Sequence, residues 1–113
     1  MSYKYIIEVL HQLGFSKLSA EVYIYLAKEG AKTIEELATG LIVNKGELTS
    51  VLESLESEGT VIATQIHSKR FIAIKFDELL QNYVTNEAAI AINIVKNRET
   101  LIDNWLKFVK NET

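Results

Sequence analysis

The sequence predicts a mainly helical fold with one small β-hairpin, an α+β fold, followed by a long C-terminal helix. Three observations point to it. Apolar residues recur at helical spacing in the stretch 44–58, between an asparagine that caps a helix and a glycine that ends one. The apolar period shortens to about two residues over 61–75, which is typical of strands. Helical spacing then returns from residue 77 to about residue 110.

Two helices are expected at the start of the chain, over residues 3–13 and 17–28. Apolar side chains repeat on one face of each, at spacings of three and four residues. Each helix is followed by a glycine, and Ser16 is an N-cap for the second one. Both are therefore predicted to be amphipathic helices.

A short helix, a tight turn and a second helix follow. Thr33 and Glu36 form a capping box at the start of the short helix. Residues 39–43 are the turn, in which Gly40 is expected to take a positive φ. The second helix covers 44–58. This order of elements is that of a helix-turn-helix, in which the second helix is the recognition helix.

The expected recognition helix has two distinct faces. Its apolar face is formed by Leu48, Val51, Leu52 and Leu55. Its other face carries short and mostly uncharged side chains, namely Lys45, Gly46, Thr49, Ser50 and Glu53. Such a face suits the major groove of DNA, where polar side chains form hydrogen bonds with base edges. The alternative is a face that is only solvated.

After Gly59 the sequence favours a β-hairpin. Two β-rich runs, 61–66 and 71–75, are separated by a polar link that contains Lys69 and Arg70. A hairpin after a helix-turn-helix is the wing of a winged helix-turn-helix. We expect Lys69 and Arg70 to contact the phosphate backbone or the minor groove. The alternative is a charged turn that protects the hairpin edge from aggregation.

The other predicted DNA contacts lie on the helix-turn-helix. Lys45 would meet a phosphate or a guanine edge, and Gly46 would let the backbone come close. Thr49 and Ser50 are one turn further on, where side chains reach base edges. Thr33 lies at a helix N-terminus, which attracts phosphate. For each of these residues, ordinary capping or a solvated surface is the competing interpretation.

Residues 77–110 are predicted to form one long helix or two in tandem. Alternating spacings of four and three define a seam of Leu80, Val84, Ala91, Ile94, Leu101, Trp105 and Phe108. Such a seam favours packing between two chains, and the alternative is packing on the helix's own domain. We therefore expect a winged helix-turn-helix domain over 1–76 and a dimerisation extension over 77–113.

A resemblance to a known family rests on two groups of residues. The first is 13–17 and 20–23 with Leu26, and the second is Leu52, 54–56, Gly59 and Val61. These residues look like the opening and the end of the recognition helix in TrmB-like transcriptional regulators, over about 10–76. The resemblance implies a winged helix-turn-helix that binds operator DNA as a dimer, mostly in archaea, with short members that lack a sugar-binding domain. MarR-like regulators have the same order of elements and are close competitors.

The charge distribution opens a second interpretation. The net charge is −3, whereas DNA-binding domains are typically basic. Residues 33–60 carry one Lys against six Glu, a net of −5, and 61–76 carry three basic side chains and no acid, a net of +3. We therefore keep, beside a homodimeric regulator of double-stranded DNA, a protein-interaction module that uses the acidic surface without reading DNA.

Other classes of protein find no support. No apolar run approaches the roughly 18 residues of a membrane span, and there is no signal-peptide pattern, so a cytoplasmic protein is expected. The sequence lacks cysteine, a glycine-rich phosphate loop and a nucleophile elbow. Glu35 and Glu36 point about 100° apart on a helix and do not form an acid–base pair. We expect no enzyme activity, cofactor, metal site or small-molecule domain.

Overall fold

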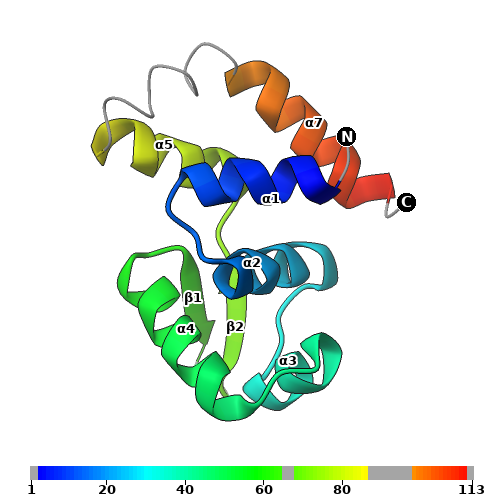
Figure 1. Ribbon diagram of the computed structural model, residues 1–113, viewed down its shortest axis with the longest axis vertical. Coiled ribbons are helices and arrows are strands. Elements are labelled where there is room, and N and C mark those ends of the chain that lie inside the picture. Colours follow the sequence, from blue (N-terminus) through cyan, green and yellow to red (C-terminus); the bar gives the residue numbers. More distant parts are fainter. Residues whose placement is uncertain (1–2, 65–67, 87–97, 112–113) are drawn as a thin grey trace. The chain divides into compact units, whose positions relative to one another are not determined.

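The computed structural model describes most of the chain, namely residues 3–64, 68–86 and 98–111. One compact unit is formed by 16–74, and a second by 1–15 together with 75–113. The described residues are mostly helical with one two-stranded antiparallel sheet, which confirms the predicted fold class (Figure 1). This division does not test the functional boundary expected at residue 76, which stays a prediction.

The unit 16–74 contains three helices and a hairpin among its described residues. They are α2 (Lys17–Glu29), α3 (Ile34–Leu41), α4 (Lys45–Ser57), β1 (Val61–Thr64) and β2 (Arg70–Ala73). Helix α4 packs against α2, α3 and β1, and α2 also packs against β2 (Figure 1). The expected order of helix, short helix, recognition helix and wing is therefore confirmed.

The caps that the sequence predicts are present in this unit. The Ser16 hydroxyl accepts from the Ser19 N–H at 3.2 Å, and the Asn44 side chain accepts from the Glu47 N–H at 2.8 Å. Gly59 has a φ of 78° just after α4 and lets the chain turn into the hairpin. Three leucines of α4, Leu48, Leu52 and Leu55, are buried, so the apolar face is the one predicted.

The hairpin is tied to the segment before α3. Val61 lies opposite Ala73 and Ile62 opposite Ile72, and the inward residues Val61 and Phe71 are buried. The N–H of Phe71 donates to the carbonyl of Lys32 at 2.8 Å, and the N–H of Lys32 donates to the carbonyl of Phe71 at 3.2 Å. The residue before Arg70's neighbour in the core is thus fixed, and the wing is held beside the start of α3.

The turn between α3 and α4 differs from the prediction for Gly40. Gly40 lies inside α3, and the residue with a left-handed backbone is Ile42, with φ 57° and ψ 55°. Gly40 has another reason to be glycine, because a Cβ there would collide with the Tyr25 hydroxyl. Ile42 is 90% exposed, so its strained conformation is not offset by burial of its side chain.

The second unit contains α1 (Tyr3–Gln12), α5 (Phe76–Asn86) and α7 (Arg98–Asn111). The rings of Phe76 and Trp105 stack with centroids 4.5 Å apart. In one continuous helix these residues would be about 43 Å apart at 1.5 Å per residue. The single long helix is therefore wrong, and α5 and α7 instead pack against each other.

This packing buries part of the predicted seam inside the chain. Leu80, Leu101 and Trp105 are all at most 5% exposed. Ala91 and Ile94 lie outside the described residues, as does the side chain of Val84. The argument that a helix this long needs a second chain to cover it therefore no longer holds. A dimer must rest on other residues of this unit.

Candidate nucleic-acid interface

The polar face of α4 is exposed as the sequence predicts. Lys45, Gly46, Thr49 and Ser50 all lie on the surface, opposite the leucine face that packs into the core. The cap at Asn44 and the buried leucines fix the rotation of the helix about its axis. The polar face therefore cannot turn inward without exposing Leu48, Leu52 and Leu55.

Two residues of this face also have local structural roles. The Thr49 hydroxyl donates to the carbonyl of Lys45 at 2.8 Å, one turn earlier, so only its lone pairs remain for a base or a water molecule. A Cβ at Gly46 would lie 3.3 Å from the Asn44 side-chain oxygen, close enough to disturb the cap. Gly46 therefore protects the start of α4, whether or not DNA approaches there.

The basic residues predicted to contact DNA are each paired with a carboxylate of the same unit. The nitrogen–oxygen distances are 3.1 Å for Lys45 and Glu35, 3.0 Å for Arg70 and Glu36, and 3.8 Å for Lys69 and Glu56. All six side chains are exposed. The sequence showed the cations but not their partners, because 10, 13 and 34 positions separate the paired residues along the chain.

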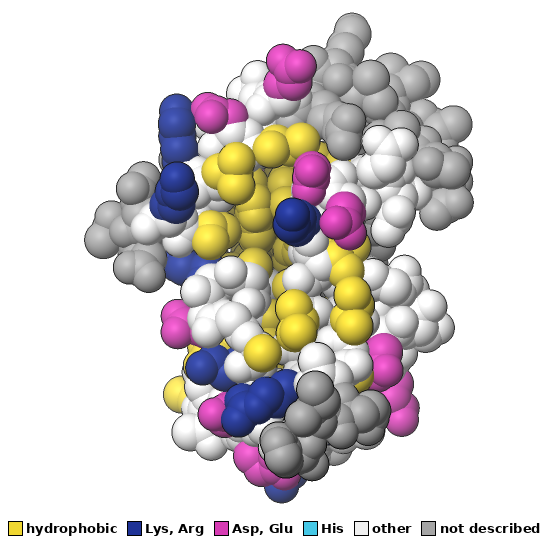
Figure 2. Space-filling view, turned by 180° about the vertical axis from the view of Figure 1, so that it is seen from behind, with side chains coloured by type: hydrophobic (Ala, Val, Ile, Leu, Met, Phe, Trp, Pro, Cys, Tyr) yellow, Lys and Arg dark blue, Asp and Glu magenta, His cyan; other side chains and the backbone are white. Residues whose placement is uncertain are grey.

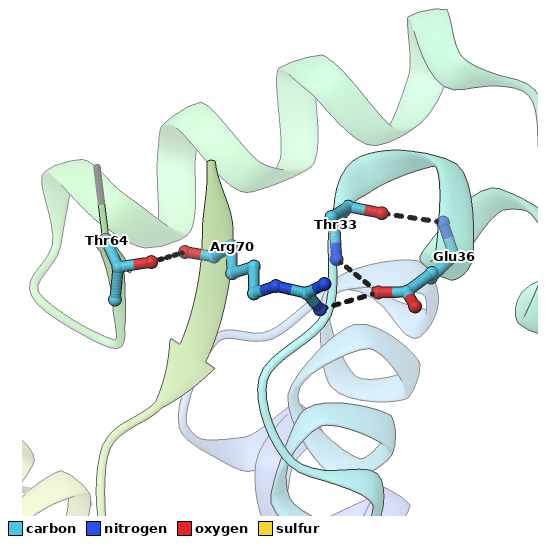
Figure 3. A network of polar contacts seen from close by, with 4 residues as sticks. All are labelled: Thr33, Glu36, Thr64 and Arg70. Carbon is cyan, nitrogen blue, oxygen red and sulfur yellow. Dashed lines mark hydrogen bonds and ion pairs between the residues drawn. The ribbon is translucent and has the colours of Figure 1, made fainter. Parts of the chain in front are cut away.

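Glu36 lies at the centre of a small network (Figure 3). One of its carboxylate oxygens accepts from the Thr33 N–H at 2.9 Å and from the Arg70 guanidinium at 3.0 Å. The Thr33 hydroxyl in turn accepts from the Glu36 N–H at 3.2 Å, which completes the predicted capping box. The N-terminus of α3, where a phosphate was expected beside Thr33, thus already holds a carboxylate.

These contacts keep the two carboxylates of α3 ionised at neutral pH. A hydrogen bond and the charge of Lys45 hold the pKa of Glu35 below its ordinary value. The hydrogen bond from the Thr33 N–H, and then the charges of Arg70 and Lys32, lower the pKa of Glu36. At neutral pH each cation therefore faces a full negative charge.

The resulting surface is mixed in charge. On the face shown in Figure 2, basic and acidic side chains lie interspersed over the part of the view that the unit 16–74 occupies. No three His, Asp or Glu side chains of the described residues are placed to hold a metal ion. Within the same described ranges, no helix is long and apolar enough to cross a membrane.

A helix-turn-helix with an exposed polar recognition helix, followed by a two-stranded hairpin, defines a winged helix-turn-helix protein. Residues 10–77 match the model of the family described as sugar-specific transcriptional regulator TrmB, and the chain belongs to that family. It is accordingly a DNA-binding transcriptional regulator and not an enzyme, as the residues suggested.

One solved structure is similar over almost the whole chain. It is the crystal structure of a MarR-like transcriptional regulator from Thermotoga maritima, with 18% identity and a TM-score of 0.54. The match covers 98% of this chain and 96% of the other. At this level of identity the likeness supports the fold alone. The comparison with curated proteins gives no match.

Proposed function

We propose that the chain is a homodimeric, sequence-specific regulator of double-stranded DNA, with the helix 44–58 in the major groove and the wing 61–75 on the backbone or in the minor groove. The observation that carries this proposal is the exposed polar face of α4 above three buried leucines. A helix that shows small polar side chains outward can approach base edges closely.

The proposed contacts divide into base readers and phosphate contacts. Thr49 and Ser50 would read base edges, and Gly46 leaves space for the backbone. The remaining proposed contacts reach phosphates, and they are Thr33, Lys45, Lys69 and Arg70. Each cation must exchange its carboxylate for a phosphate oxygen when DNA binds. We therefore expect weak and strongly salt-dependent binding.

The proposed dimer uses the outer face of α7 within 77–113. Ile102, Leu106 and Val109 are spaced by four and three residues and share one face of this helix. Leu106 is 54% exposed, and the other two are partly exposed. Trp105 of the same helix points into the unit instead. A second copy that covers this stripe would give a two-fold dimer, which suits a palindromic DNA site.

Fluorescence anisotropy of the full chain with a pool of labelled random duplexes at several salt concentrations tests this function. The double variant Lys69→Ala with Arg70→Ala should bind more weakly, and its slope of log K against log salt should fall by about 0.9 per lost phosphate contact. Lys107→Ala with Lys110→Ala on α7 removes the same charge and is the control. Unchanged affinity and slope in the wing variant would show that the wing assignment is wrong.

A protein-interaction module remains the second candidate, because every proposed phosphate-binding cation is already neutralised within the unit. Such a module would dock a partner on the acidic surface of 33–60. The same titration separates the two functions. Binding of duplex at low salt favours the regulator, and no binding at any salt concentration favours the interaction module.

A further inference from the structure

A groove of about 380 Å³ lies between α3, α4 and the wing. Its floor is apolar and is formed by Ile34, Leu52 and Phe71. Its rim is polar and carries Glu35, Thr49, Glu53, Glu56, Ser68 and Lys69. The volume falls within the range of sites for small organic molecules, roughly 300–1,000 Å³. The groove therefore combines an apolar floor with a charged rim, as ligand sites do.

The rim favours a cation over an anion. It carries three carboxylates and one ammonium group. Glu53 and Glu56 are three residues apart on α4, so their carboxylates lie on the same side of the helix. Glu53 has no ion-pair partner among the residues that the structure describes. A concave surface with an excess of negative charge concentrates cations from solution.

The protein's own Lys69 shows what such a site holds. Its ammonium nitrogen lies 5.4 Å from the centre of the Phe71 ring and 3.8 Å from a carboxylate oxygen of Glu56. An aromatic ring and a carboxylate around one cation are the elements that recognise organic ammonium groups. The ion-pair distance is longer than a hydrogen bond, so another cation can replace this contact at low cost.

We propose that this groove binds a small organic cation with an apolar body. Its ammonium group pairs with Glu53 and Glu56 in place of Lys69, and its apolar part lies on Leu52 and Phe71. This binding does not require DNA. Thr49 and Lys69 are shared with the DNA contacts of the proposed function, and to that extent the effect on DNA rests on it: the cation then competes with duplex.

The test is an NMR titration of the ¹⁵N-labelled full chain with 4-phenylbutylammonium. The matched probes are 4-phenylbutan-1-ol, which lacks the charge, and 4-phenylbutyrate, which reverses it. A ring contact and an exposed ion pair together predict that the ammonium binds about tenfold tighter than the alcohol. Its shifts should centre on the amides of residues 53, 56 and 71. Equal affinity for all three probes, or shifts elsewhere, would overturn the proposal.

Two variants make the test specific. Glu53→Gln should bring the affinity for the ammonium close to that for the alcohol. Glu58→Gln is the control, because Glu58 is exposed near the end of α4 but does not line the groove. An equal loss in both variants would mean a general charge effect and would refute the site. A chain that binds the ammonium but no duplex would support the site and refute the proposed function, so the two can fail separately.

Discussion

Replacement of Glu36 by Gln should increase the affinity for DNA. Glu36 is ion-paired with Arg70 at 3.0 Å, and this guanidinium is proposed to contact phosphate. In the native chain the contact with phosphate requires that the pair with Glu36 is broken. The variant removes this competition and also removes a negative charge from the surface that faces the phosphates.

The size of the effect follows from the exposure of the pair. Ion pairs between exposed side chains change an equilibrium by a factor of roughly 1.5 to 5. The lost repulsion between the carboxylate and phosphates adds to this factor, and it is screened beyond about 8 Å at physiological salt. We expect the Kd to fall about two- to fivefold at 0.15 M salt, and further at lower salt.

The fold should survive this change. A glutamine oxygen can still accept from the Thr33 N–H, because capping boxes use Glu or Gln at this position. Anisotropy titrations measure the Kd, and Glu99→Gln in the first turn of α7 is the matched control. If Glu36→Gln leaves the Kd unchanged, or if Glu99→Gln lowers it equally, the ion pair does not limit DNA binding.

The same pair predicts how stability depends on pH. Because the pKa of Glu36 is lowered in the folded chain, its contribution is present above the unfolded value of about 4.5 and is lost as the pH falls through the folded pKa. The Tm of the native chain should therefore exceed that of Glu36→Gln near neutral pH. The difference should shrink between pH 5 and 3. A constant difference over this range would contradict the assignment.

Three further changes test the turn and the dimer. Ile42→Gly should raise the free energy of unfolding by roughly 0.5–1 kcal/mol in urea titrations, because glycine relieves the left-handed backbone. Gly40→Ala should lower it by about 1–2 kcal/mol through the collision with Tyr25, and the same change should stabilise a Tyr25→Ala background, where helix propensity alone acts. Leu106→Glu should give monomers by analytical ultracentrifugation, whereas Lys107→Glu on the same helix should not.

Local signals predicted the winged helix-turn-helix well. The caps at Ser16, Thr33 and Asn44 and the stop at Gly59 depend on residues within one turn, and the structure has all four. The buried face of α4 follows from periodicity in the same way. Such features depend on hydrogen bonds and spacing inside one element, so the sequence carries them completely.

Features that depend on distant segments were not predicted. Gly40 was assigned a positive φ because glycine usually serves that purpose, but its reason is the Tyr25 ring of another helix. The stacking of Phe76 on Trp105 shows that α5 and α7 turn back on each other, whereas their apolar spacing fits one rod equally well. Periodicity records which face is apolar but not what covers it.

The sequence by itself determined the order of the elements, their caps and the outward polar face of α4, since these follow from interactions between near neighbours. Only the tertiary structure decided that Lys45, Lys69 and Arg70 each lie beside a carboxylate. Residues that are 10 to 34 positions apart become neighbours only when α3, α4 and the wing pack together, and the charge that DNA would meet is set by that packing.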